Sequence, residues 1–452
     1  MQKRKTNLKT MKKYLFFSLS LLFFAITSQA QTKLTLRKAI AQALETNPQI
    51  KLAELNVRKT QQQVRETKGI ALPQANAYLN YEDNLKLATQ LLPGELMGQP
   101  GRQIPVQFGT KYSMTMGAEL QQLIYSQTYW AGLKAIKQVG DLNQLEIKNA
   151  KEETAFQVAQ IYYLAQITAK QREIIRNNLD KTTKLLAILE VQFAQGVIQK
   201  NELDRLKVSQ TNLQTEGENL ETAYQQQLNM LKYMTATSMD TQMQLVDSIQ
   251  TLGLLPTADA SNVQNRISIQ LLMKQKDIEN LQIKVTQAGY YPMLSAYARY
   301  NHQAQRNTWS FFNTNERWFD FSTIGLRLNV PIFDGFQKHS RVQQSKIRLQ
   351  QLDIQTTNQK NFLQMEYANI QNRLRNQQTI INKQQANINL AEQVYQTTQI
   401  QYQNGTTTLA ELLNSETALR ESQTNYFTAL VQAKVAELEF IRANGTLLDI
   451  LN

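Results

Sequence analysis

The stretch YQNGTTTLAELLNS, Tyr402–Ser415, ends the longest segment of the sequence that carries no helix breaker. Glycine and proline are absent from Phe336–Asn404, and Gly405 then follows directly. A glycine at this point supplies the left-handed backbone conformation that terminates a helix. Thr408 and Glu411 have the spacing of a capping box, which starts a new helix. The stretch therefore predicts the turn of a long helical hairpin.

A second stretch of the same kind, FAQGVIQKNELDRL, lies 209 residues earlier at Phe193–Leu206. It aligns Gly196 with Gly405, although the capping box is missing because Gln199 stands where Thr408 does. Two further landmark pairs are Gly117 with Gly325, at an offset of 208, and Pro73 with Pro292, at an offset of 219. The paired landmarks occur in the same order and at nearly constant spacing in the two halves of the chain, which indicates an internal duplication.

Each copy is expected to form a short helix, two strands and a long helical hairpin. The predicted hairpins contain no proline, which would remove a helix hydrogen bond. The opening helices are expected at about 35–68 and 262–287, and the Gly- and Pro-rich segment LLPGELMGQPGRQIP is expected to be an exposed loop. The sequence is predicted to divide into a signal peptide at 1–30, a first repeat at 31–257 and a second repeat at 258–452. In the first repeat, strands are expected at about 71–82 and 112–125 and a hairpin at about 128–250 with its tip at 193–202. In the second repeat, strands are expected at about 291–302 and 319–333 and a hairpin at about 336–444 with its tip at 402–411.

The first thirty residues have the features of a secretory signal peptide. Lys12 and Lys13 precede the apolar run Tyr14–Ile26, and Ser28 and Ala30 supply small residues for cleavage. The apolar run is short for a bilayer span, and a retained membrane anchor is the alternative. Six basic residues and no acidic residue precede the cleavage site, so the formal charge of +13 overstates the charge of the mature chain.

Composition argues against several classes of protein. The chain has no cysteine and only two histidines, which speaks against disulfides, thiolate metal sites and histidine-based catalysis. Its basic residues are interspersed with acids, so a nucleic-acid partner is not expected. No P-loop, Gly-x-Ser-x-Gly or His-Glu-x-x-His motif occurs, so we expect no enzyme, no cofactor and no metal. The pair Glu152-Glu153 is interpreted as a solvated helix face.

The predicted strands alternate apolar and polar side chains with a period of two. In TIGLRLNVPI, Thr323–Ile332, the side chains of Ile324 and Leu326 oppose those of Gly325 and Arg327. This pattern fits a soluble sheet covered by helices and fits transmembrane strands equally well. Aromatic residues gather between the last two strands, where a membrane girdle would lie: Trp309, Phe311, Phe312, Trp318, Phe319 and Phe321.

Four strands cannot close a barrel, because bacterial outer-membrane barrels begin at eight. Open strand edges are not tolerated in lipid, where each unpaired backbone group costs several kcal/mol. If the strands enter a membrane, several chains must share them. Three chains would supply twelve strands and twelve long helices around a channel.

The helical segments are long enough to require lateral packing. Asp141–Gln195 and Phe336–Asn404 would be rods of about 80 and 100 Å. The returning helices carry residues spaced by seven, as in coiled coils. These are Leu206, Leu213 and Leu220 in the first copy and Leu412, Leu419, Tyr426, Ala433 and Phe440 in the second. Each rod is therefore expected to have a narrow apolar seam and a polar, wetted side.

In combination, these features resemble the TolC-like outer membrane efflux proteins over nearly all of the mature chain. LTLRKAIAQALETNPQIKLAE, Leu34–Glu54, resembles the opening segment of that family, with Asn47-Pro48 echoed at Asn265-Arg266. The stretches at Gly196 and Gly405 resemble its duplicated hairpin turns. The resemblance implies a mostly α-helical fold with a small membrane β part, in which a homotrimer forms a twelve-stranded barrel in the outer membrane and a helical tunnel across the periplasm.

The resemblance also implies partners and sites. The partners would be a periplasmic adaptor, or membrane fusion protein, and an inner-membrane transporter. The residues that would contact the adaptor are Gln195, Gly196, Val197, Asn404, Gly405 and Thr406. The candidates for a periplasmic aperture are Glu202, Arg205, Glu411 and Asn414. Arg205 and Asn414 depart from the acidic side chains common in the family, and Glu411 serves equally well as a helix cap.

The leading functional hypothesis is therefore a passive exit duct of a tripartite efflux or secretion system. The alternative is a periplasmic coiled-coil scaffold or adaptor without a membrane barrel. Extraction from membranes separates the two, because a barrel needs detergent. The sequence does not name the cargo, which could be a drug, a metal, another small molecule or a protein.

Overall fold

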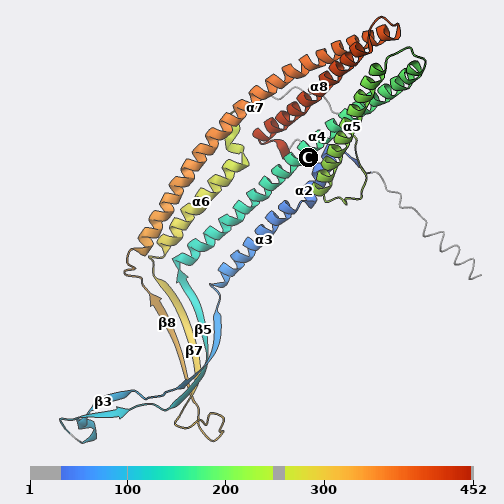
Figure 1. Cartoon of the computed structure of the whole chain (residues 1–452). Coiled ribbons are helices and arrows are strands. Elements are labelled where there is room, and N and C mark those ends of the chain that lie inside the picture. The colour runs from blue at the N-terminus through green and yellow to red at the C-terminus, as the bar shows by residue number, and fades with distance from the viewer. Residues whose placement is uncertain (1–31, 99, 248–259, 449–452) are drawn as a thin grey trace, which may run out of the picture. The chain divides into compact units, whose positions relative to one another are not determined.

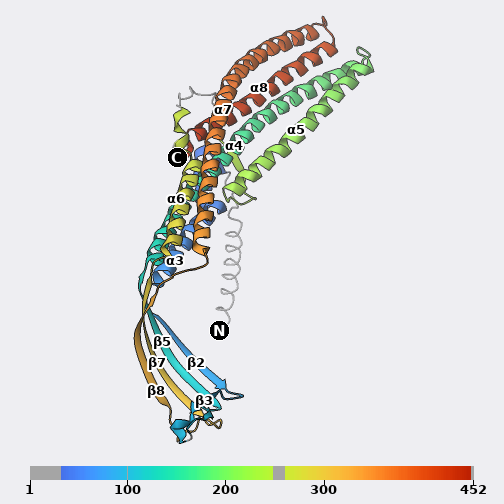
Figure 2. The same cartoon turned by 90° about the vertical axis from the view of Figure 1, so that its left-hand side faces the viewer.

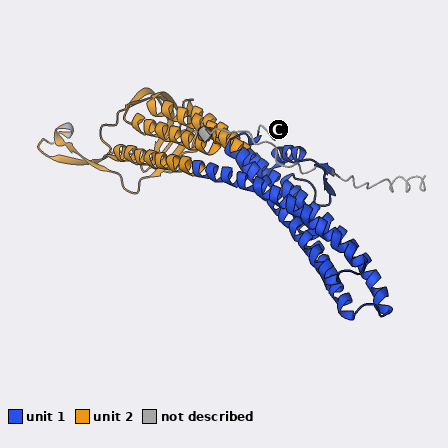
Figure 3. Ribbon diagram, turned by 90° about the horizontal axis from the view of Figure 1, so that it is seen from above, with its two compact units in different colours: residues 1–50, 150–262, 364–452 blue, residues 51–149, 263–363 orange. Residues whose placement is uncertain are grey.

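The computed structural model describes residues 32–98, 100–247 and 260–448, so the predicted signal peptide at 1–30 lies outside the described residues. The chain divides into two compact units, shown in different colours in Figure 3. Unit 1 comprises residues 1–50, 150–262 and 364–452, and unit 2 comprises 51–149 and 263–363. Each unit takes segments from both predicted repeats.

Long helices in two matched pairs dominate the described chain (Figure 1). α4 spans Gln127–Ala194 and α7 spans Gln337–Gln403, with 68 and 67 residues, or about 100 Å each. Both run from unit 2 into unit 1. α5, Lys200–Met234, and α8, Leu409–Ala443, return beside them and contain 35 residues each. The matched lengths agree with a duplicated fold.

Unit 1 has a core where the opening of the chain packs against the long helices. β1, Thr32–Leu34, pairs in parallel with β6, Met243–Leu245, and α2 spans Leu36–Thr46. The fully buried Tyr162 of α4 places its hydroxyl 2.9 Å from both the Leu34 carbonyl and the Asp247 carboxylate. The same carboxylate accepts a hydrogen bond from the Leu36 amide at 2.7 Å. These contacts hold the opening segment onto α4.

The predicted apolar seam is present on the returning helices. Its buried members on α5 and α8 include Leu206, Leu213, Leu412, Leu419, Ala433 and Phe440. The small residues beside the seam of α8, Ser415, Ser422, Ala429 and Ala436, are buried as well. Burial at this spacing is the packing of a coiled coil.

The first hairpin ends earlier than expected. We predicted helix to about residue 250, but α5 ends at Met234. Ala236 has a left-handed backbone with φ of 50°, and the Thr237 amide donates to the Lys232 carbonyl at 2.8 Å. This cap stops the helix, and the chain then leaves to form β6 beside β1.

The opening helix is also broken in two. We predicted one helix at about 35–68, but α2 ends at Thr46 and α3 spans Pro48–Gly69. A residue before proline is disfavoured in helical conformation, and Asn47 has ψ of 127°. In the second copy, a short helix η2, Ala260–Asn265, precedes α6, Ile267–Ala288.

The four predicted strands form one antiparallel sheet in unit 2 (Figure 2). They are β2 (Gln74–Asp83), β5 (Tyr112–Ser126), β7 (Met293–Arg306) and β8 (Phe319–Asn329), in the order β2-β5-β7-β8. β5 and β7 join the two repeats, with a register irregularity between Leu123 and Tyr125. β2 and β8 are the edges, and each pairs with one strand only.

The Gly- and Pro-rich loop between β2 and β5 contains structure that we did not predict. β3, Thr89–Pro93, pairs antiparallel with β4, Gln103–Gln107, and the short helix η1 at Gly94–Met97 lies between them. The loop between β7 and β8 packs its aromatic rings together. Phe311 is buried there, with its ring centroid 6.0 Å from Tyr81 and 6.3 Å from Trp318.

Among the described residues, no helix is both long enough and apolar enough to cross a membrane.

Candidate functional site

The two helical hairpin tips lie in unit 1 and have the same backbone structure. After α4, the Gly196 amide donates to the Phe193 carbonyl and the Val197 amide to the Gln192 carbonyl, both at 2.9 Å. This pair of bonds defines a Schellman motif, and the φ of 77° at Gly196 is the left-handed conformation that it requires.

The second tip repeats these bonds. The Gly405 amide donates to the Tyr402 carbonyl at 3.0 Å, and the Thr406 amide to the Gln401 carbonyl at 2.9 Å. Gly405 has φ of 71°. The prediction that a glycine ends each long helix is confirmed at both tips.

The helices restart differently after the two turns. Thr408 Oγ1 accepts a hydrogen bond from the Glu411 amide at 3.3 Å and caps α8. Gln199, at the start of α5, makes no side-chain cap bond. The sequence predicted this difference, because only the second copy has a hydroxyl residue at the cap position.

The six predicted docking residues all lie exposed at the turns: Gln195, Gly196, Val197, Asn404, Gly405 and Thr406. Directly behind them, a leucine cluster joins the two hairpins. It consists of Leu186, Leu189, Leu203, Leu206, Leu409 and Leu412. One chain therefore presents two exposed turns on a common apolar base.

A cavity of about 450 Å³ opens between the two hairpins near their tips. Of the four predicted aperture residues, Glu202 lines this cavity, while Arg205, Glu411 and Asn414 are exposed elsewhere. Glu202 lies near Tyr402, and burial together with the Glu202 charge raises the pKa of that phenol.

Two further charged residues, Lys181 and Glu416, line this cavity and were not predicted from the sequence. Glu416 is the more buried contact between the hairpins. Its carboxylate lies 3.5 Å from the Thr182 hydroxyl of the other hairpin. Burial raises the pKa of Glu416, and Arg420, Thr182 and Lys181 oppose the shift only in part. The i,i+4 spacing of Glu416 and Arg420 was the available signal, but it does not reveal which helix the carboxylate faces.

A pair of opposite charges also crosses between the hairpins, one turn further from the tips than Glu416. Arg420 Nη1 lies 3.9 Å from Glu216 Oε2. Together with the Thr182–Glu416 contact, it gives the two hairpins polar links in addition to their leucine base.

The interpretation of Glu152-Glu153 as a solvated face was wrong. Glu152 is buried and lies 3.2 Å from Arg442 Nε, while Glu153 lies 2.6 Å from Arg442 Nη2. The guanidinium also lies 4.8 Å from the centre of the Phe156 ring. Both carboxylates therefore belong to a partly buried ion-pair network of unit 1.

In unit 2, one face of the sheet is polar and carries an ion-pair network. The guanidinium of Arg299 approaches Glu119 through two nitrogens, at 3.0 and 3.1 Å. Arg299 and Arg327 lie 5.1 and 5.4 Å from the centre of the Tyr297 ring. Both arginines of this face are thus paired or stacked.

Each repeat places a tyrosine opposite a glycine on this polar face. Tyr78 pairs with Gly117 and Tyr297 with Gly325 in the strand register. A Cβ atom at Gly325 would lie 2.6 Å from the Tyr297 hydroxyl oxygen, and one at Gly117 would lie 3.1 Å from Tyr78 Cζ. Glycine therefore leaves the space in which each ring lies across the neighbouring strand.

Among the described residues, no group of three or more His, Asp or Glu side chains is arranged to hold a metal ion.

Comparison with known proteins agrees with this architecture. The outer membrane efflux protein family matches the chain in two segments, residues 39–237 and 262–446. Outer membrane protein TolC of Salmonella enteritidis is 22% identical in an alignment that covers 97% of this chain and 87% of that protein.

Solved structures share the fold at low sequence identity. The Campylobacter jejuni CmeC outer membrane channel superposes with a TM-score of 0.74 at 15% identity, covering 91% of this chain and 85% of that one. The outer membrane protein VceC of Vibrio cholerae gives a TM-score of 0.70 at 19% identity, covering 91% and 96%. The fold is that of the TolC-like channels, internally duplicated. The family match spans most of both repeats, and the chain therefore belongs to the outer membrane efflux protein family, whose members are transport ducts of the outer membrane rather than enzymes.

Proposed function

We propose that three copies of this chain form the exit duct of a tripartite efflux or secretion system. The duct lies in the outer membrane, extends into the periplasm and passes small molecules passively when it is docked to a periplasmic adaptor and an inner-membrane pump. The observation that carries this proposal is the four-stranded sheet, with one apolar face, one polar face and two unpaired edges.

The apolar face supports contact with lipid. On β8, Ile324, Leu326 and Leu328 are 87%, 71% and 63% exposed. The register continues this face across the sheet through Ala298, Leu120 and Ala75. So large an exposed apolar area is unfavourable in water and favourable in a bilayer.

The edges support closure by copies of the chain. Since neighbouring strands are antiparallel, the edge strands β2 and β8 run in opposite directions. The β8 edge of one copy can therefore pair antiparallel with the β2 edge of the next, as a head-to-tail ring requires. Two copies would give eight strands, whose interior is filled by side chains, whereas three give twelve strands and room for a channel.

The hairpin tips support docking. Their six predicted contact residues are all exposed at the turns, so an adaptor can approach them end-on. In this proposal Glu202, Arg205, Glu411 and Asn414 lie around the periplasmic opening. Because Arg205 and Asn414 stand at two of these positions, the opening carries less negative charge than four carboxylates would give.

The experiment is purification of the processed protein in detergent, mass determination and planar-bilayer conductance. We expect detergent-dependent extraction, a trimeric mass and discrete conductance steps. A monomer that stays in aqueous solution without detergent would instead favour the scaffold or adaptor without a barrel.

A second experiment addresses docking separately. Val197→Asp at the first tip should reduce capture of the adaptor while leaving bilayer conductance unchanged. Val208→Asp is the matched control, because Val208 is also exposed but lies in the body of α5. Equal loss of capture in both variants would place the docking surface elsewhere.

A further inference from the structure

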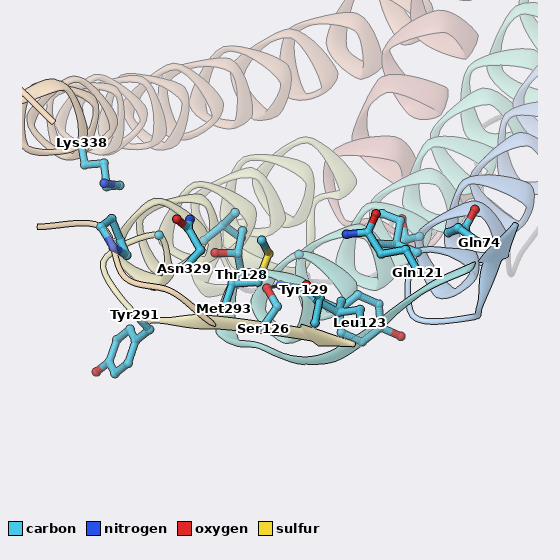
Figure 4. A pocket seen from close by; sticks show the side chains of 17 residues that line it. Gln74, Gln121, Leu123, Ser126, Thr128, Tyr129, Tyr291, Met293, Asn329 and Lys338 are labelled. Atoms are coloured by element: carbon cyan, nitrogen blue, oxygen red, sulfur yellow. Dashed lines mark hydrogen bonds between the residues drawn. The ribbon is translucent and has the colours of Figure 1, made fainter. Parts of the chain in front are cut away.

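A cavity of unit 2 lies where the strands meet the helices (Figure 4). It has a volume of about 790 Å³, within the range of about 300–1,000 Å³ found for small-molecule sites. Its lining includes the helix-side ends of all four strands of the sheet, through Gln74, Gln121, Met293 and Asn329. We refer to it as the wall recess.

The wall recess opens on the polar face of the sheet. Gln121 follows Glu119 by two residues, Ser295 precedes Tyr297 by two, and Asn329 follows Arg327 by two. Side chains two apart on a strand share a face. The strand residues of the recess therefore lie on the same face as the Glu119–Arg299 pair. In the proposed trimer that face is the interior of the duct.

The lining of the recess differs from the rest of that face. Its body is apolar, made by Ile70, Leu123, Tyr129, Val285 and Met293. Apart from Lys338, its polar side chains are amides and hydroxyls, and in the described part of the chain those of Gln121, Thr128 and Asn329 carry no hydrogen bond to protein. In Figure 4 the Tyr291 ring is turned away from the other labelled side chains.

The recess is also nearly free of uncompensated charge. Its single ionisable ammonium belongs to Lys338, which lies 3.1 Å from the Asp334 carboxylate. By contrast, the adjoining part of the face carries Arg299, Glu119 and Arg327. An ion would be attracted to that charged zone, whereas an uncharged molecule gains most by burying apolar surface in the recess.

We propose that the wall recess is a cargo-binding station for uncharged amphipathic small molecules, with an aromatic or aliphatic body and amide or hydroxyl groups. This inference rests on the proposed duct function and deepens it by naming a substrate class and a place. The apolar body of the cargo contacts Leu123, Val285 and Met293, and its polar groups bond to Gln121 and Asn329. Three such recesses line one trimer.

Gly132 of α4 offers a direct way to fill the recess. It lines the cavity, and a Cβ built on it meets no atom within 4 Å. Gly132→Trp therefore introduces a ring without a clash at Cβ, and replacing glycine within a helix is favourable for the backbone. Gly140→Trp is the matched control. It makes the same change in the same helix outside the cavity lining, where a Cβ has only Thr60 at 4.0 Å.

The experiment records single trimers in planar bilayers with chloramphenicol, an uncharged aromatic amide with hydroxyl groups, as the probe. We expect wild type and Gly140→Trp to show reversible, concentration-dependent current interruptions. Gly132→Trp should conduct but require at least about tenfold more probe for half-block, because the new ring takes the space in which the apolar body of the probe would be buried.

The outcomes separate this inference from the proposed function. Two results overturn the binding station without contradicting the duct: steady conductance of wild type without interruptions, or block of Gly132→Trp at the same probe concentration as wild type. Equal block by the anion 1-naphthalenesulfonate overturns the assignment to uncharged cargo. Absence of any conductance overturns the duct, and the station with it.

Discussion

Ala236 and Gly445 occupy the same left-handed backbone position, 209 residues apart, directly after α5 and α8. Their φ angles are 50° and 72°. The matching amide bonds are Ala236 to Tyr233, Thr237 to Lys232, Gly445 to Arg442 and Thr446 to Ile441, at 3.2, 2.8, 2.9 and 3.3 Å. One cap is therefore built twice, with alanine in the first repeat and glycine in the second.

Ala236→Gly should stabilise the protein. An L side chain is strained in the left-handed region, and relief of that strain outweighs the greater freedom of glycine in the unfolded chain. We expect a gain of about 0.5 kcal/mol, seen as a higher Tm of the helical circular-dichroism signal in detergent. Gly445→Ala should lower the Tm by a similar amount. A lower Tm for Ala236→Gly would contradict the assignment of this cap.

Gly325→Ala should weaken the sheet. The new methyl group would lie 2.6 Å from the Tyr297 hydroxyl oxygen, closer than packed atoms allow. Overpacking of this kind costs about 1–3 kcal/mol, and we expect a smaller fraction of assembled oligomer on native electrophoresis. Adding Tyr297→Ala should restore part of the loss, because it removes the clashing ring. Normal assembly of the single variant would show that the ring moves aside without cost.

Glu416→Gln should stabilise the hairpin tips near neutral pH. Burial raises the pKa of Glu416 above its ordinary value of 4.5, despite the nearby Arg420 and Lys181. The stability linked to a raised carboxyl pKa is fully present below the unfolded-state value and is lost as the pH rises through the folded-state value. At neutral pH the wild type therefore holds an unfavourable buried charge, which glutamine lacks.

The measurement is the difference in Tm between Glu416→Gln and wild type across pH 4–8. We expect this difference to be largest at neutral pH and to shrink as the pH falls toward 4.5. Taking the difference between the two proteins removes the titration of all other groups. A constant difference over the whole range would show that burial does not shift this carboxyl.

Arg442→Met should be strongly destabilising. It keeps much of the aliphatic packing of the arginine but leaves Glu152, whose side chain is 7% exposed, without its cation. Breaking such a pair costs about 3 kcal/mol, and Glu152→Gln in the same chain should recover part of it. Arg373→Met is the control. Its pair with Glu439 is more exposed, at 47% and 28%, and should be worth less than about 1 kcal/mol. Equal losses for both variants would contradict the buried character of the Glu152 pair.

Local features were predicted well because neighbouring residues determine them. The turns at Gly196 and Gly405, the cap at Thr408 and the missing cap at Gln199 all depend on a few adjacent residues. The break at Asn47-Pro48 is equally local, because proline restricts the conformation of the residue before it. We nevertheless predicted one continuous helix across this position. The β3–β4 hairpin was missed because its prolines and glycines are also those of an irregular loop.

The sequence by itself determined the duplication, the long helices with their apolar seams, and the strands with one apolar and one polar face. Each of these features follows from residues that recur at a fixed spacing along the chain. Only the tertiary structure decided which charges are buried and what surrounds them. Glu152 meets Arg442 across 290 positions, and Glu416 meets Thr182 across 234. The wall recess combines residues from Thr67 to Lys338. Such groups come together only when the chain folds, because burial and electrostatic contact depend on distance in space and not on spacing along the chain.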